Sequence, residues 1–123
     1  MTWHFANDRP IHTQLSEQIR LRIISGEYSA GSRLPSVREL AGEASVNPNT
    51  MQKALSELEQ SGLIYSQRTS GRYVTEDTAM IECVKEEIAE KKIREFFQVM
   101  NGLGLKPGDT LKLVEKAAKE MSQ

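Results

Sequence analysis

Residues 34–53 read LPSVRELAGEASVNPNTMQK and contain two signals for the start of a helix. Ser36 can cap the first helix, and Glu39, three residues later, completes a capping box in which each residue binds the backbone N–H group of the other. Asn47 can cap the second helix, whose first position is taken by Pro48, where the missing N–H group is not needed. Two helices separated by about three residues predict a helix-turn-helix.

The residues before this stretch predict one further helix and an extended N-terminal segment. Trp3 and Phe5 alternate with polar neighbours, which indicates a short segment laid on the core. Gly26 marks the C-terminal end of the helix. The helix itself is indicated by apolar residues that recur at every fourth position, the spacing of one helical face: Ile11, Leu15, Ile19 and Ile23.

The residues after the helix-turn-helix predict a β-hairpin. Gly62 ends the second helix, residues 63–67 and 72–75 have the composition of strands, and the polar residues 68–71 form the turn between them. A hairpin at this place is the wing of a winged helix. The predicted fold is therefore mostly α with a small β-hairpin, in which a winged helix-turn-helix over residues 1–75 precedes a two-helix tail.

The tail, residues 76–123, is helical, charged and amphipathic. Gly102 and Gly104 break its first helix, and Pro107 opens a second one. The apolar stripe of the first helix is too broad for one further helix to cover, so the simplest partner is the tail of a second copy. The alternative is that the tail packs back on its own winged helix and the chain stays monomeric. The residues expected at a dimer interface are Ile81, Val84, Ile88, Phe96, Met100, Leu111 and Val114.

The exposed side of the second helix of the helix-turn-helix carries side chains that can read DNA. Asparagine and glutamine can form paired hydrogen bonds with an adenine edge in the major groove, and a helix N-terminus can donate to a phosphate. Arginines and a glycine at the wing turn can approach the duplex closely. A solvated helix face would show the same polar residues, but the order of the elements favours DNA. The candidate contacts are Arg38, Asn47, Asn49, Thr50, Gln52, Lys53, Arg68, Gly71 and Arg72.

The net charge of the 123-residue chain is −1, which by itself argues mildly against a nucleic-acid partner. Residues 1–75 contain 8 basic and 7 acidic side chains, and residues 76–123 contain 8 basic and 10 acidic side chains. A surface that binds DNA must therefore arise from local clustering of basic residues rather than from bulk charge.

No cofactor, metal or catalytic centre is expected. His4, His12 and the single cysteine, Cys83, lack the number and spacing of a zinc site. The sequence contains no serine–histidine–aspartate arrangement and no glycine loop that cradles a phosphate, so we expect no enzyme. No apolar run approaches the roughly 18 residues of a membrane span. No signal peptide is seen, and together with the single cysteine this favours the cytoplasm.

Residues 10–75 contain segments whose combination is highly specific. They are Pro10-Ile11 with Gln14, ISGEY at 24–28, GSRLPSVRELA at 31–41, VNPNTMQKAL at 46–55, Leu58-Glu59 and Gly62-Leu63-Ile64. This part of the chain resembles the DNA-binding domain of the GntR family of bacterial regulators. The short tail resembles that of the YtrA-like subfamily, which dimerises through two helices. The resemblance implies DNA contacts at Arg38, Asn47, Asn49, Thr50, Gln52 and Gly71.

These observations predict a sequence-specific, DNA-binding transcriptional regulator that binds a pseudopalindromic double-stranded operator as a homodimer. The resemblance implies repression. A winged helix that binds protein or RNA is the alternative, because this fold also serves as a docking module. The near-neutral charge favours that alternative, whereas Arg38 and the wing arginines favour DNA. The sequence assigns neither an operator sequence nor a small-molecule effector.

Overall fold

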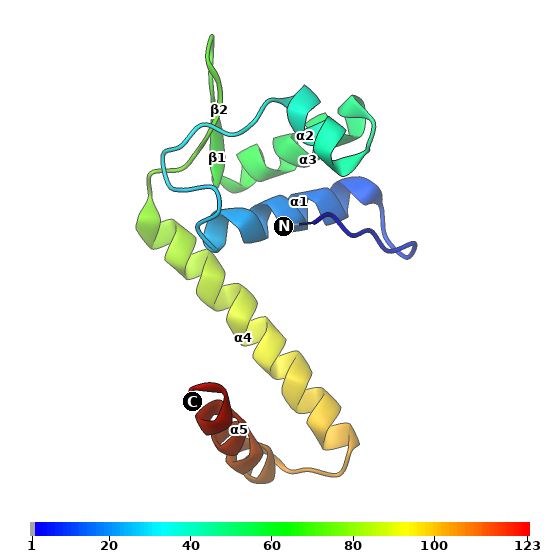
Figure 1. The fold of residues 1–123 in the computed structure, drawn as a ribbon, viewed down its shortest axis with the longest axis vertical. Coiled ribbons are helices and arrows are strands. Elements are labelled where there is room, and N and C mark those ends of the chain that lie inside the picture. The colour runs from blue at the N-terminus through cyan, green and yellow to red at the C-terminus, as the bar shows by residue number, and fades with distance from the viewer. Residues whose placement is uncertain (1) are drawn as a thin grey trace. The chain divides into compact units, whose positions relative to one another are not determined.

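The computed structural model describes residues 2–123 (Figure 1). Its element order confirms the predicted fold class, since a three-helix domain with a hairpin is followed by two further helices. Within the described residues, no helix is both long and apolar enough to cross a membrane. The elements are α1 (Ile11–Ile24), α2 (Val37–Ala44), α3 (Pro48–Ser61), β1 (Ile64–Gln67), β2 (Gly71–Val74), α4 (Thr78–Gly102) and α5 (Pro107–Met121).

The chain forms two compact units, one ending at Val84 and the other running from Lys85 to Gln123. The division falls inside α4, whereas composition alone places it after Thr75. Ile81, near the start of α4, is buried at 8% exposure, so the first turns of this helix belong to the first unit. Composition could not reveal this boundary, because the helix continues through it without a break.

The core of the first unit lies where α3 packs against α1 and α2, with the hairpin following directly from the end of α3 (Figure 1). The apolar stripe predicted for the first helix supplies Leu15 and Ile19 to this core. Full burial of one such side chain contributes roughly 1.5–3 kcal/mol relative to its exposure to water. The apolar residues of this core with 1% exposure or less are Leu15, Ile19, Leu40, Met51, Ala54, Leu55, Leu63, Ile64 and Val74.

Both predicted helix starts of the helix-turn-helix are confirmed. The hydroxyl of Ser36 accepts a hydrogen bond from the backbone N–H of Glu39 at 3.1 Å, and the carboxylate of Glu39 accepts one from the N–H of Ser36 at 3.2 Å. Asn47 Oδ1 accepts a hydrogen bond from the N–H of Asn49 at 2.8 Å. Between the helices, Ser45 has a φ of 56°, a left-handed conformation that turns the chain sharply enough to start α3.

The wing contains a pairing that the sequence analysis did not predict. β1 and β2 are antiparallel, with Gln67 opposite Gly71, so β2 begins one residue earlier than expected. The segment before α2 adds to the outer edge of β2: the N–H of Leu34 donates to the carbonyl of Arg72 at 2.9 Å, and the N–H of Val74 donates to the carbonyl of Ser32 at 2.9 Å. The wing is therefore tied directly to the start of the helix-turn-helix.

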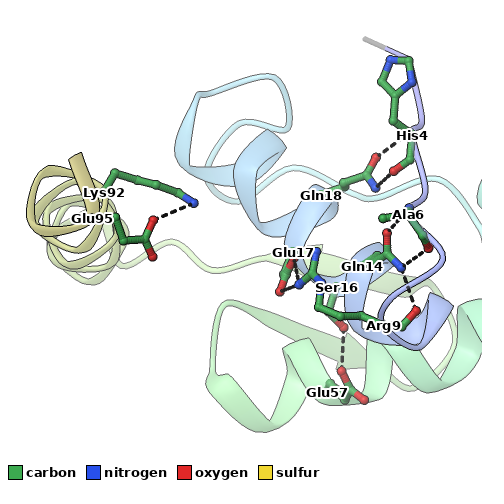
Figure 2. A network of polar contacts seen from close by, with 10 residues as sticks. All are labelled: His4, Ala6, Arg9, Gln14, Ser16, Glu17, Gln18, Glu57, Lys92 and Glu95. Carbon is green, nitrogen blue, oxygen red and sulfur yellow. Dashed lines mark hydrogen bonds and ion pairs between the residues drawn. The ribbon is translucent and has the colours of Figure 1, made fainter. Parts of the chain in front are cut away.

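Residues 2–9 form an arm that is fastened to α1 (Figure 2). The side chain of Gln14 is buried and donates to the carbonyls of Ala6 at 2.9 Å and of Arg9 at 2.8 Å, while its own oxygen accepts from the N–H of Ala6 at 2.7 Å. The ring of Trp3 lies 3.5 Å from the guanidinium carbon of Arg22, which is buried at 3% exposure. The expected N-terminal segment is therefore held by polar contacts as well as by its aromatic side chains.

Candidate nucleic-acid interface

The helix α3 presents one apolar face to the core and one polar face to the surroundings. Met51 and Leu55 are buried, whereas Asn49, Gln52 and Lys53 are exposed. This is the separation that a helix needs if it is to enter the major groove while remaining packed on its own domain. The structure thus brings these three predicted contact residues onto the accessible part of α3.

The N-terminus of α3 and the first turn of α2 place the next candidates. Asn47 uses its side-chain oxygen to cap α3, which leaves its amide nitrogen to donate to a phosphate. Thr50 is half-buried in the first turn of α3, where its backbone N–H donates to the carbonyl of Asn47 at 3.0 Å and its hydroxyl can donate to a phosphate. Arg38 is exposed in the first turn of α2. Each of these residues can therefore offer donors to the sugar–phosphate backbone or to a base edge.

The two predicted wing arginines differ in their surroundings. Arg68 is exposed in the turn between β1 and β2. Arg72 is half-buried, and its Nε donates to the Glu59 carboxylate of α3 at 2.5 Å. The hydroxyl of Ser66 donates to the same carboxylate oxygen at 2.6 Å. The hydrogen bond from Ser66, followed by the contact with Arg72, holds the pKa of Glu59 below its usual value. Arg72 therefore braces the wing against α3, while Arg68 stays accessible.

Gly71 has a φ of 111°, a backbone conformation that residues with a side chain rarely adopt. A Cβ atom placed on Gly71 would lie 3.2 Å from Nε of Arg33, so the guanidinium of Arg33 runs along the glycine backbone. Arg33 is not among the candidates predicted from the sequence. Its basic side chain within the segment GSRLPS was the available signal, but its nearness to Gly71 depends on the bridge between Arg33 and Tyr73, which was not predicted.

Basic side chains occur on the helix-turn-helix, on the wing and in the segment that pairs with it. Between residues 33 and 74 they are Arg33, Arg38, Lys53, Arg68 and Arg72. The same stretch contains four carboxylates, of which Glu39 caps α2, Glu59 binds Arg72, and Glu57 binds Ser16 and His12 of α1 (Figure 2 shows the contact with Ser16). Local clustering can therefore make a DNA-binding surface on a chain whose net charge is −1.

The predicted dimer residues fall into two groups. Ile81 is buried within the first unit, so its side chain is already covered without a partner and it is not part of an accessible apolar face. Val84, Ile88 and Met100 are half-buried. The second unit exposes several large apolar side chains, among them three of the predicted residues. They are Ile93, Phe96, Val99, Leu103, Leu111, Leu113, Val114 and Met121.

No group of three or more histidine, cysteine, aspartate or glutamate side chains that could hold a metal ion occurs among residues 2–123. Cys83 is exposed on α4. The candidate interface contains amides, hydroxyls, guanidinium groups and the ammonium of Lys53, which recognise a ligand by hydrogen bonding and charge.

Comparison with known sequences supports this description. The sequence pattern of bacterial regulatory proteins of the gntR family matches residues 11–74. The chain is 35% identical over 101 residues to the HTH-type transcriptional regulator YhcF of Bacillus subtilis, an alignment that covers 82% of this chain and 84% of YhcF. It is 38% identical over 87 residues to the HTH-type transcriptional repressor YtrA of the same organism, covering 66% of this chain and 67% of YtrA.

Solved structures give the same picture. A GntR family transcriptional regulator from Listeria monocytogenes superposes with a TM-score of 0.84 at 39% identity, covering 91% of this chain and 98% of that chain. The DNA-binding domain of AraR, solved in complex with operator ORX1, superposes with a TM-score of 0.55 at 27% identity, covering 58% of this chain and 93% of that chain. The first likeness extends over nearly the whole chain, and the second over somewhat more than half of it.

Proposed function

The chain belongs to the GntR family of bacterial regulatory proteins, and from this premise we propose that it is a repressor that binds a pseudopalindromic operator as a homodimer. Membership makes it a DNA-binding transcriptional regulator rather than an enzyme. The proposal adds the oligomeric state, the symmetry of the DNA site and the sign of regulation.

The DNA-binding part of the proposal rests on which charged and polar groups of the first unit are exposed and which are engaged in contacts within the fold. Asn49, Gln52 and Lys53 are exposed on α3, while Glu39 and Glu59 are engaged in contacts within the fold. A surface arranged in this way presents hydrogen-bond donors and the positive charge of Lys53 to a phosphate backbone. The AraR domain, which has a similar fold, has been solved bound to an operator.

The homodimer is supported by the apolar side chains that the second unit exposes. Phe96 is 41% exposed, Val99 is 62% exposed and Leu103 is 71% exposed. Large clustered apolar surfaces of this kind generally mark an interface. A second copy of the same unit offers a surface of matching chemistry, and a two-fold dimer would present two recognition helices to two half-sites of one operator. Repression is proposed because the relative YtrA is a repressor.

Selection of binding sites from a random pool of DNA duplexes tests the proposal. The recovered motif should consist of two inverted half-sites whose centres are separated by about one helical turn or a multiple of it. Binding to that duplex, measured by fluorescence anisotropy, should weaken steeply as salt is raised, because phosphate contacts release counterions. Recovery of a single asymmetric half-site, or of no motif, would contradict the proposal.

Two further measurements test the oligomeric state and the sign of regulation. Analytical ultracentrifugation should show a dimer at micromolar concentration. Addition of the protein to an in vitro transcription reaction, whose promoter overlaps the selected site, should lower transcript yield in proportion to site occupancy. A monomer would remove the homodimer from the proposal, and a rise in transcript would replace repression by activation.

A further inference from the structure

Three arginines lie on the wing or beside it, and their surroundings differ. Arg72 is held by Glu59 of α3. Arg68 lies at the exposed turn. Arg33 is also exposed, and among the ion pairs of the described residues none includes it. A cation that is exposed and unpaired can meet a phosphate or a base without first breaking a contact inside the protein.

The strand register fixes the side of the wing on which each arginine lies. Arg33 is paired with Tyr73 in an antiparallel bridge, so the two side chains stand on the same face. Gly71 is two residues before Tyr73 and shares that face. Arg72 stands on the opposite face, the one that contacts α3 through Glu59. The guanidinium of Arg33 can therefore lie over Gly71, because the glycine leaves the space of a side chain empty.

The position of Arg33 also connects the wing with the helix-turn-helix. Its backbone lies between β2, to which it is joined by an isolated β-bridge at Tyr73, and Ser36, which caps α2. Hydrogen bonds from the backbone N–H and hydroxyl of Ser36 lower the pKa of Glu39, and the positive charge of Arg33 lowers it further. The positive charge of Arg33 therefore acts on Glu39 in the first turn of α2. The guanidinium of Arg33 lies close to Gly71, at the end of β2 that adjoins the wing turn.

We propose that Arg33 is the residue through which the wing enters the minor groove of operator DNA, at A·T base pairs that flank the bases read by α3. This inference rests on the proposed function. The narrow minor groove of A·T-rich DNA has an enhanced negative potential that attracts an inserted arginine. Gly71 contributes by letting the DNA backbone and the guanidinium approach the same point, and Arg72 contributes by holding the wing in place.

The test compares wild type with Arg33→Ala and Arg33→Lys on two duplexes. Both duplexes carry the motif selected by wild type, and they differ only in having A·T or G·C pairs at the flanks. Wild type should prefer the A·T flanks. Arg33→Ala should bind the A·T duplex roughly tenfold more weakly and lose the preference for A·T flanks. The slope of its log affinity against log salt concentration should be smaller in magnitude by about one. Arg33→Lys should recover part of the affinity, because lysine keeps the charge but not the planar guanidinium.

A charge-matched control separates this effect from a general loss of positive charge. Arg94 is exposed on α4 in the second unit, and Arg94→Gln should leave both the affinity and the flank preference unchanged, provided that sedimentation shows an intact dimer. Circular dichroism should show that Arg33→Ala remains folded, since the side chain is exposed.

The outcomes distinguish this inference from the proposed function. If wild type binds no duplex, the proposed function fails. If wild type binds but Arg33→Ala binds as tightly, the inference alone is overturned. An equal loss of affinity on both duplexes would show a phosphate contact rather than insertion into the minor groove, and would also overturn it.

Discussion

The two units of this chain differ in how far their apolar side chains are buried. Every buried apolar side chain among residues 2–123 lies at or before Ile81, and so belongs to the first unit. In the second unit the buried residue is Thr110, a polar one. Two helices joined by a short turn can cover only a part of each other's surface. Most of the apolar side chains of the first unit are therefore covered within a single copy, whereas many of those of the second unit are exposed.

The exposed side chains of the two units differ in kind. The first unit buries most of its large apolar side chains, with Ile11 and Leu21 as exposed exceptions, and leaves amides and guanidinium groups exposed, where they can meet DNA. The second unit leaves Phe96, Val99 and Leu103 outside, where they can meet another apolar surface. If the comparison is right, changes in the first unit should alter DNA binding directly. Changes in the second unit should alter it through the dimer.

Removal of the second unit should have the largest effect. A chain that ends after Val84 keeps Ile81 in its core and should fold as a monomer. It should bind the selected operator roughly 10²–10⁴-fold more weakly, because the two half-sites are no longer engaged by linked domains. Anisotropy and ultracentrifugation measure both properties. A shorter chain that ends after Thr75 loses the packing of Ile81 and should also unfold at a lower temperature. An undiminished operator affinity of the chain ending at Val84 would contradict a contribution of the second unit to DNA binding.

Substitution of one exposed apolar residue should have the next largest effect. Phe96→Asp places a charge on the expected interface and should raise the dimer dissociation constant by roughly 30-fold or more, which corresponds to ~2 kcal/mol or more at an interface hot spot. Glu90→Asp, a mild change of an exposed residue on the same helix, is the control. A dimer of wild-type strength would remove Phe96 from the interface.

Substitution at the recognition surface of the first unit should change DNA binding and leave the dimer unchanged. Arg38→Ala should weaken operator binding by ~1–3 kcal/mol, while the dimer dissociation constant and the unfolding temperature stay at their wild-type values. Gln52→Ala should instead relax the preferred base at a defined position of the selected motif. Either variant can be selected against the same random pool as wild type. Unchanged affinity for Arg38→Ala, or an unchanged motif for Gln52→Ala, would remove that residue from the interface.

The smallest expected effect concerns the brace between α3 and the wing. The pKa of Glu59 is lowered in the folded chain by Ser66 and Arg72, so its contribution to stability is present above the unfolded value near 4.5 and is lost as pH falls through the lower folded value. Because this carboxylate is partly exposed, the contribution should be about 0.5–1 kcal/mol. Urea unfolding measured between pH 6 and pH 3 should show that the free energy of unfolding decreases less in acid for Glu59→Gln than for wild type. An equal decrease in both proteins would show that the contact of Glu59 with Ser66 and Arg72 is not coupled to folding.

Much of the fold could be predicted from the sequence because its signals are local. The capping box of Ser36 and Glu39, the Asn47 cap and the glycine that ends α3 each act on backbone groups within a few residues. The confirmed helix and strand order follows from these signals together with the apolar periodicity. The polar face of α3 was predictable in the same way, since the positions of Asn49 and Gln52 on the helix follow from their spacing relative to buried residues.

The rest depended on contacts between distant parts of the chain. The pairing of residues 32–34 with β2 brings Arg33 to Gly71, and the packing of the hairpin on α3 turns Arg72 toward Glu59, thirteen residues away in sequence. The burial of Ile81 moved the boundary between the units into α4. The sequence by itself determined where the capped helices α2 and α3 begin, because their capping hydrogen bonds join residues that are close in the sequence. Only the tertiary structure decided which arginine braces the wing and which lies open, because a side chain's freedom is set by the neighbours that packing brings to it.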